Sequence, residues 1–292
     1  MLVNLKKILS EAKKGGYAVG AFNCPNFESL RAIIDAAEEM HAPVILNHAQ
    51  IHEELIPIEV IGPLMVKYAK EAHVPVCVNL DHGTTFDMCM KALRVGFTSV
   101  MYDASGEPYK KNIDQTKEMV RICHAVDVSV EAELGHIFVS ENGVGEAPKK
   151  IETACNSDVS SMYTDPDLAR DFVEKTGIDA LAIAFGTAHG IYTVKPVLDL
   201  DRITAIKKKI DIPFVMHGGS GLSEKEFRTA IQNGIVKINY YTYMTMEGAK
   251  AVKSRIAEKN DGEPIFFHDL SLCATKAMKE NVKEAIRIFS MK

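Results

Sequence analysis

Eight short apolar runs recur along the chain, and this repetition constrains the fold more than any other feature. The runs are YAVGAFN (17–23), PVILNHA (43–49), PVCVNLDHG (75–83), SVMYDAS (99–105), VSVEAELG (128–135), ALAIAFGTAHG (180–190), IPFVMHGGSG (212–221) and GIVKINYYT (234–242). Their hydrophobicity is continuous rather than alternating, a pattern typical of strands that are covered on both faces, as in parallel sheets.

The stretches between these runs predict helices. Apolar residues repeat at helical spacing in Phe27–Met40, Asp199–Lys209 and Ser223–Asn233,. Ser223 begins Ser-Glu-Lys-Glu, whose first and fourth residues predict a capping box. Eight strands that alternate with helices predict an α/β fold, a closed (β/α)8 or TIM barrel. An open doubly wound sheet is the alternative, but it usually has fewer strands and a glycine-rich first turn, which Gly15-Gly16-Tyr17 does not supply.

The length of 292 residues is ordinary for one barrel,. We therefore expect a single domain over 1–292, with a helical tail at about 263–292 outside the eight units. The net charge of −5 gives no positive field that would favour nucleic acid or a membrane surface,. The six cysteines form no CxxC pair, and the charged start of the chain resembles a helix rather than a signal peptide,. These features predict a cytoplasmic protein that binds neither nucleic acid nor membrane.

Polar residues gather where the predicted strands end. They are Asp81 and His82 on the third strand, Asp103 on the fourth, Glu133 on the fifth, His189 on the sixth, His217 on the seventh and Asn239 on the eighth. In a barrel these ends converge on one mouth, where barrel enzymes have their sites. A lone histidine near an apolar strand is usually structural, but three at equivalent ends would be brought together.

Three neutral imidazoles around zinc leave one coordination position open, as in catalytic zinc sites. Zinc at such a site polarises a carbonyl and stabilises an enediolate. We therefore predict a zinc or similar divalent site at the three histidines. The other seven histidines are expected to be structural, although His48 and His136 lie near strand ends and could line the pocket.

A phosphate site is predicted at Gly218-Gly219-Ser220-Gly221, between a strand and a helix. Backbone N–H groups and the N-terminus of the following helix can hold an anion there, and barrels often bind phosphate after the seventh strand. A simple turn is the alternative. The long polar connection between Gly135 and Tyr163 is expected to be a functional lid or a disordered loop.

Six motifs occur in the order LDHG, DAS, EAELG, GTAHG, HGGSG and KIN. With this order and spacing, the chain up to about residue 245 resembles class II fructose- and tagatose-bisphosphate aldolases. The resemblance implies that His82, His189 and His217 bind the catalytic zinc and that Asp81 moves the proton of the substrate C4 hydroxyl. It also implies that Asp103 and Glu133 hold a second metal or orient the first ligands.

The resemblance extends to the substrate. It implies that a phosphate lies among Gly190, Gly218, Ser220, Asn239 and Thr242, with a monovalent cation (Na⁺ or K⁺) near Gly190. We also expect Asn23 and Tyr241 to contact the substrate, and the chain to form a homodimer or homotetramer. Glu141 lies at the spacing of a family glutamate that handles the C–H proton of dihydroxyacetone phosphate. Here Phe138-Val139 replaces the Gly-Gly pair of relatives, so a solvated loop carboxylate is the alternative.

Three positions depart from the family pattern. Tyr241 replaces Asp or Ala, Ala49 replaces a serine of fructose-bisphosphate aldolases, and Thr193 replaces a lysine of some members. No obvious arginine serves a second phosphate. We therefore expect a ketose 1-phosphate, or a substrate of unusual chain length, rather than fructose 1,6-bisphosphate. Tyr241 could instead point away and pack under the following helix.

The predicted activity is reversible aldol cleavage of a phosphorylated ketose to dihydroxyacetone phosphate and an aldehyde. One alternative is a Schiff-base aldolase, for which Lys237 is the candidate lysine. Lys237 lies before the end of its strand, which favours a buried ion pair with a nearby carboxylate instead. The other is a non-catalytic sugar-phosphate-binding protein on the same barrel, against which Asp81 and the three histidines argue.

Overall fold

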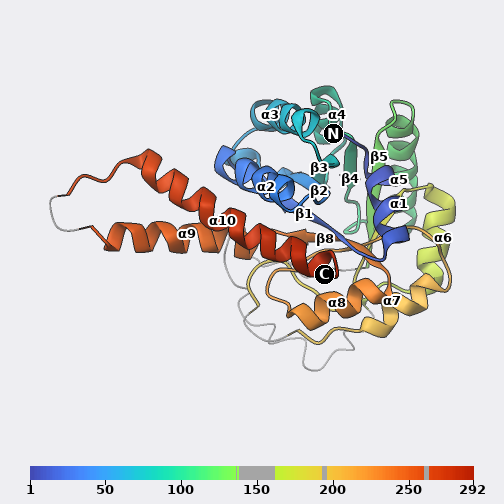
Figure 1. The fold of residues 1–292 in the computed structure, drawn as a ribbon. Helices are drawn as coiled ribbons and strands as arrows, with labels where there is room; N and C mark the ends of the chain where they lie inside the picture. Colours follow the sequence, from blue (N-terminus) through green and yellow to red (C-terminus); the bar gives the residue numbers. More distant parts are fainter. Residues whose placement is uncertain (136, 138–161, 193–195, 260–262) are drawn as a thin grey trace.

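The computed structural model describes residues 1–135, 137, 162–192, 196–259 and 263–292. Eight parallel strands close into a barrel in chain order (Figure 1). They are β1 (Val19–Asn23), β2 (Val44–Ala49), β3 (Val76–Gly83), β4 (Ser99–Tyr102), β5 (Ser129–Leu134), β6 (Ala180–Ile183), β7 (Phe214–Met216) and β8 (Ile235–Tyr240). The barrel prediction is confirmed and the open sheet is wrong, because β1 pairs with β8.

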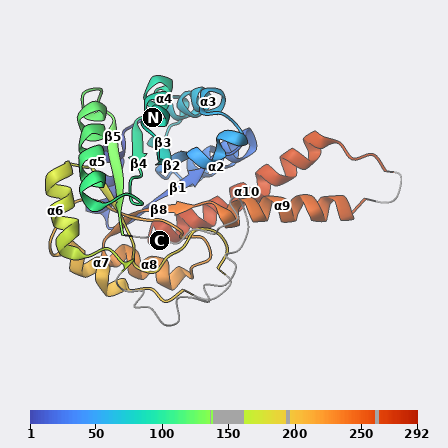
Figure 2. The same ribbon diagram turned by 180° about the vertical axis from the view of Figure 1, so that it is seen from behind.

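Helices cover the outside of the barrel (Figure 2). The elements are α1 (Leu5–Gly15), α2 (Phe27–Glu39), the 3-10 helix η1 (Gln50–Glu54), α3 (Ile58–Glu71), α4 (Phe86–Val95), α5 (Tyr109–His124), α6 (Pro166–Thr176), α7 (Leu200–Lys207), α8 (Glu224–Asn233), α9 (Thr242–Ala257) and α10 (Phe267–Phe289). The three predicted helices are present. The capping box is also present, since the Glu226 N–H donates to Ser223 Oγ at 3.4 Å and the Ser223 N–H donates to Glu226 Oε2 at 2.8 Å.

The continuous hydrophobicity of the strands has a direct structural reason: both faces of each strand are buried. Outward side chains pack against the helices in one large cluster, and inward side chains form a second cluster inside the barrel. Leu5 and Leu9 of α1 belong to the inner cluster and are fully buried. Burial of each such side chain stabilises the fold by about 1.5–3 kcal/mol. Helix α1 therefore closes the N-terminal end of the barrel and leaves the C-terminal end as its mouth.

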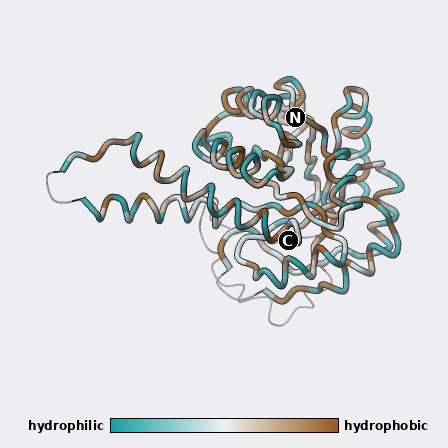
Figure 3. Tube along the Cα trace, viewed as in Figure 1, coloured by the Kyte–Doolittle hydropathy of each residue, from teal (hydrophilic) through white to brown (hydrophobic). Residues whose placement is uncertain are grey.

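Helices α9 and α10 form an arm that extends away from the barrel (Figures 1 and 2). They pack against each other, and α10 returns to pack on α2 and β1. The sequence predicted the helical tail but not the separate helix α9. Hydrophobic and hydrophilic residues alternate along both helices (Figure 3). Near the outer end, Phe266 and Phe267 keep 53% and 81% of their surface exposed, so the arm presents apolar surface that the described chain does not cover.

None of the helices among the described residues combines the length and the apolar character needed to cross a membrane. Cys24, Cys77, Cys89 and Cys123 are buried and unpaired, as is usual for free cysteines,.

Candidate active site

Three histidines converge at the mouth of the barrel. The ring centroids of His82 and His217 are 4.6 Å apart, those of His82 and His189 are 5.0 Å apart, and those of His189 and His217 are 5.7 Å apart. Each offers a ring nitrogen within 4.8 Å of the others, and His82 Nε2 lies 2.9 Å from His217 Nδ1. The predicted histidines are thus brought together, and their donor set fits a divalent metal ion.

The backbone at His82 departs from a regular strand. The pairing register between β3 and β4 shifts between Leu80 and Gly83, and His82 has a φ of 47°. A positive φ is uncommon for a residue with a Cβ atom, and such strain is concentrated at functional sites. The irregularity re-aims the imidazole relative to a regular strand.

Carboxylates fix the orientation of two of these rings. His82 Nδ1 donates to Asp103 Oδ2 at 2.7 Å, and His217 Nε2 donates to Glu131 Oε1 at 3.0 Å. The opposite nitrogens, His82 Nε2 and His217 Nδ1, face each other at 2.9 Å, and both could turn to a metal ion, as in carboxylate–histidine–metal arrangements,. Glu131 was not among the residues predicted from the sequence. Its signal was its place two residues before Glu133, which puts both on the same face of β5.

Lys237 forms a buried ion pair with the same glutamate. Its Nζ lies 2.6 Å from Glu131 Oε2, and the side chains of Lys237, Glu131 and His217 are all fully buried. Burial opposes ionisation of Glu131, but the positive charge of Lys237 and the hydrogen bonds from His217 and Lys237 together outweigh it and lower the pKa of the carboxyl. The ion-pair interpretation of Lys237 is therefore confirmed.

The ionisation of the three histidines differs with their surroundings. Burial lowers the pKa of His217, and it lowers the pKa of His189 to about 3 with the help of His82. Burial acts in the same direction on His82, but Asp81 and the hydrogen bond to Asp103 outweigh it and raise the pKa to about 9. A proton must therefore leave His82 before a metal ion can bind there.

Asp81 lies beside the histidines and is held by two amides. The side-chain N–H groups of Asn23 and Asn239 donate to Asp81 Oδ2 at 3.0 Å and to Oδ1 at 2.9 Å. Burial opposes ionisation, but the charges of His82, His217 and Lys237 hold the pKa of this carboxyl below its usual range. Asp81 is thus an oriented carboxylate that can accept a proton. Asn23 and Asn239, predicted as substrate contacts, reach the site through Asp81.

Asp103 and Glu133 form a second group with His82, again within 4.8 Å. Asp103 Oδ1 accepts hydrogen bonds from Ser105 N–H and Oγ–H at 3.1 and 2.7 Å. Burial and the nearby Asp103 raise the pKa of Glu133 to about 8, and its Oε2 has no hydrogen-bond partner in the described part of the chain. Both residues thus stand where they could bind a second ion or orient His82.

The predicted phosphate loop packs closely against the loop after β6. Gly218 has a φ of 64°, and a Cβ atom there would lie 2.3 Å from the carbonyl oxygen of Ala188. Tyr192 joins the two loops, because its hydroxyl donates to the Gly218 carbonyl at 2.7 Å and accepts from Ala188 N–H at 2.9 Å. Tyr192 was not among the residues predicted from the sequence. On the other side, Ser220 Oγ accepts from Tyr241 N–H at 3.3 Å.

Gly190 and Thr242 flank this loop in the chain. Gly190 follows His189 with a φ of 95°, and Thr242 is the first residue of α9. The Tyr241 ring reaches η1, where its centroid lies 5.0 Å from that of His52. His48 is buried and contacts Glu53 at 2.9 Å, so it supports η1. Glu141, Thr193 and His136 lie outside the described residues.

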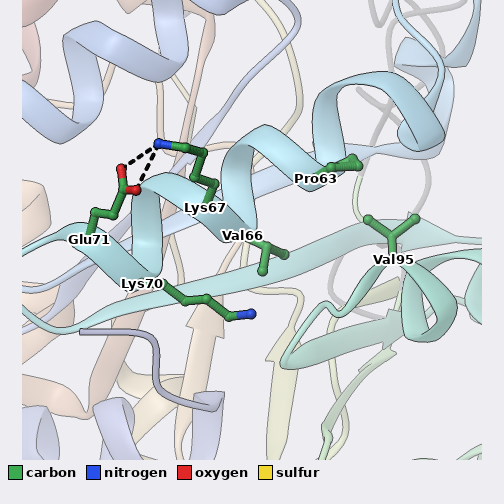
Figure 4. A pocket seen from close by; sticks show the side chains of 6 residues that line it. All are labelled: Pro63, Val66, Lys67, Lys70, Glu71 and Val95. Carbon is green, nitrogen blue, oxygen red and sulfur yellow. Dashed lines mark hydrogen bonds and ion pairs between the residues drawn. The ribbon is translucent and has the colours of Figure 1, made fainter.

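A groove on the outer surface is separate from this site. It has a volume of about 400 Å³ and is lined by Pro63, Val66, Lys67, Lys70, Glu71 and Val95 (Figure 4). Glu71 and Val95 end α3 and α4, so this part of the groove lies towards the N-terminal end of the barrel, away from the mouth. Lys67 already pairs with Glu71 at 2.7 Å.

Comparison with known proteins agrees with this geometry. The family model described as fructose-bisphosphate aldolase class-II matches residues 3–292. The YdjI aldolase from Escherichia coli K12 is 35% identical with a TM-score of 0.85, and the match covers 99% of this chain and 97% of that one.

Two further solved structures are similar. A putative fructose-1,6-bisphosphate aldolase from Coccidioides immitis is 27% identical with a TM-score of 0.84, over 98% of this chain and 96% of that one. Fructose-bisphosphate aldolase from Campylobacter jejuni shares the fold at 21% identity and a TM-score of 0.81, over 99% and 94% of the two chains. The family match over nearly the whole chain, together with the histidine cluster at the barrel mouth, means that this protein belongs to the class II fructose-bisphosphate aldolase family.

Proposed function

We propose that the protein catalyses the reversible aldol cleavage of a phosphorylated ketose to dihydroxyacetone phosphate and an aldehyde. The observation that carries this proposal is the position of Asp81, an oriented carboxylate next to three converging histidines. Together they combine a site for a Lewis acid with a base, which is what carbon–carbon bond cleavage next to a carbonyl requires.

The metal is proposed to be zinc or another divalent ion, held by His82, His189 and His217. When bound, such an ion polarises the substrate carbonyl and stabilises the negative charge that develops as the bond breaks. Asp103 and Glu131 hold two of the ligand rings in the orientation that this requires,. Asp103 and Glu133 are proposed either to hold a second ion or to keep the His82 ring in its orientation.

Asp81 is proposed to take the proton of the C4 hydroxyl. As the C4–O bond becomes a carbonyl, the C3–C4 bond breaks and its electron pair stays on C3. An acid then donates a proton to C3, and we assign this role to Glu141, which lies in the long loop outside the described residues. A well-placed acid or base typically contributes about 10²–10⁴-fold to the rate.

The substrate phosphate is proposed to bind the loop around Gly218 and Ser220, with Gly190, Asn239 and Thr242 around it and a monovalent cation near Gly190. The N-terminus of α8, which follows this loop, supports an anion there,. Tyr241 replaces the Asp or Ala that relatives have at this position. Because this substitution alters the part of the site that faces the aldehyde, we further propose that the ketose carries its phosphate on C1 only or has an unusual chain length.

Two experiments distinguish the proposed metal-dependent reaction from the two alternatives. A Schiff-base aldolase needs a free lysine at the mouth, whereas Lys237 is fully buried against Glu131. A sugar-phosphate-binding protein needs no oriented base. We expect a panel of ketose phosphates to yield dihydroxyacetone phosphate, with the activity lost on chelation and restored by zinc. Borohydride trapping of a substrate adduct would establish the Schiff-base mechanism, and binding without turnover would establish a sensor.

We also propose that the protein is a cytoplasmic homodimer or homotetramer that binds neither nucleic acid nor membrane. The exposed apolar end of the α9–α10 arm supports contact with a second copy of the chain,.

A further inference from the structure

Two aromatic rings meet above the end of β1. Tyr241 directly follows β8, and His52 belongs to η1, which directly follows β2. Strand β1 lies between β2 and β8 in the barrel. The two ring centroids are 5.0 Å apart and the ring planes are inclined by 51°. This His52–Tyr241 pair therefore spans the end of β1, where Asn23 holds Asp81.

One ring nitrogen of His52 has no hydrogen-bond partner in the part of the chain that the structure describes. Its residue surface is 3% exposed, and Nδ1 is buried without a hydrogen-bond partner among the described residues. The neighbouring His48 also has a buried Nδ1 without a partner among the described residues, but its other ring nitrogen, Nε2, lies 2.9 Å from Glu53 Oε1. Buried ring nitrogens are normally hydrogen-bonded, so an exception near a candidate active site points to a functional role.

His52 lies close enough to Asp81 for the charge of that carboxylate to act on its imidazole. Burial lowers the pKa of His52 to about 4, while the charge of Asp81 acts in the opposite direction. The imidazole is therefore neutral at neutral pH. The pair thus combines a phenol with a neutral imidazole on which the charge of Asp81 acts, and it supplies no positive charge.

The backbone and the ring of Tyr241 contact two different parts of the site. Its backbone N–H donates to Ser220 Oγ in the phosphate loop, whereas its ring turns to η1. The ring therefore lies on the η1 side of the site, away from the loop proposed to bind the first phosphate. The alternative that Tyr241 packs only under α9 leaves this contact with η1 unexplained.

We propose that the His52–Tyr241 pair forms the wall of the aldehyde subsite and selects an uncharged, hydroxylated aldehyde over a phosphorylated one. This inference rests on the proposed aldolase function. A second phosphate would bring negative charge next to Asp81, against a wall that supplies no cation to bind it. Neutral aromatic faces and polar ring atoms suit the carbon chain and hydroxyl groups of an unphosphorylated sugar aldehyde.

The test measures selectivity as the ratio of kcat/KM for a ketose 1-phosphate to kcat/KM for the matching ketose 1,6-bisphosphate. We expect His52→Ala and Tyr241→Ala each to lower this ratio by about 10–200-fold, the range for reshaping one pocket wall. His73→Ala is the matched control, because its side chain is 92% exposed on the outer surface, and it should keep the wild-type ratio. Since the two rings act together, the double variant should shift the ratio by less than the product of the single shifts.

A second assay separates this inference from the proposed function. Exchange of the C–H proton of dihydroxyacetone phosphate with deuterated solvent needs no aldehyde, so it reports on the metal and phosphate half alone. No exchange in the wild type would contradict the proposed function itself. Proton exchange in the wild type, together with an unchanged kcat/KM ratio in His52→Ala, would overturn the proposal that the His52–Tyr241 pair selects the aldehyde. If His52→Ala does not fold, His52→Asn replaces it, and an unchanged ratio there overturns the proposal equally. Shifts that multiply in the double variant would also overturn it.

Discussion

Replacing Glu131 by glutamine tests how the buried residues behind the histidines control metal binding. Glu131 accepts from His217 Nε2 at 3.0 Å and pairs with Lys237 Nζ at 2.6 Å, and all three side chains are fully buried. Loss of such a carboxylate behind a metal ligand typically weakens metal affinity by about 10–100-fold. That corresponds to about 1.4–2.8 kcal/mol of binding free energy.

The same substitution leaves Lys237 buried without a negative partner. Breaking a buried ion pair from one side costs about 3–5 kcal/mol of unfolding free energy, whereas replacing both charges by neutral groups is often nearly neutral. We therefore expect Glu131→Gln to be destabilised, and Glu131→Gln with Lys237→Met to regain most of that stability. Metal affinity should stay weak in the double variant, because His217 still lacks its carboxylate.

Two assays distinguish these effects. Competition with a chelator gives the metal affinity, and urea unfolding of the metal-free protein gives the stability. The reasoning is refuted if Glu131→Gln binds metal as tightly as the wild type. It is also refuted if the double variant recovers affinity together with stability, because the loss would then come from misfolding rather than from the orientation of His217.

Three further predictions follow from the site and the arm. Asp81→Ala should keep its metal, since Asp81 is not one of the three ligands, but lower kcat by roughly 10²-fold or more in steady-state assays; loss of the metal would instead make Asp81 a ligand. The apparent affinity for the metal ion should rise as the pH is raised towards about 9, because His82 is protonated below that pH and must lose its proton to bind the ion,. The chelator competition assay measures this affinity, and an affinity that does not change between pH 6 and 9 would contradict the prediction. Phe267→Asp should dissociate the proposed oligomer, as light scattering can measure, because it puts a charge on an 81%-exposed apolar residue of the arm; an unchanged particle mass would exclude this part of the arm from the interface.

Much of the barrel could be predicted from the sequence because each strand is buried on both faces. The same regularity placed His82, His189 and His217 at one mouth, since equivalent ends of parallel strands must meet. The partners of these residues were harder to predict. Glu131 reaches His217 and Lys237 across the barrel interior, and this depends on how β5, β7 and β8 close together.

Local departures from regular structure also escaped the sequence. The register shift at His82 and the helix η1 follow from no periodic pattern, and η1 is what brings His52 to Tyr241. Tyr192 joins the β6 and β7 loops through a single hydroxyl, a contact that only the folded loops create. The catalytic role of Glu141 remains a prediction from its spacing to Glu133.

The most direct test of the central claim is the metal content of His189→Ala, measured by elemental analysis alongside dihydroxyacetone phosphate release. The wild type and the His73→Ala control should each hold about one divalent ion per chain at the three-histidine site and cleave a ketose phosphate. His189→Ala should lose both the ion and the activity, because it removes one of the three ring nitrogens that converge at this site. A variant that keeps its metal and its activity would contradict the assigned site.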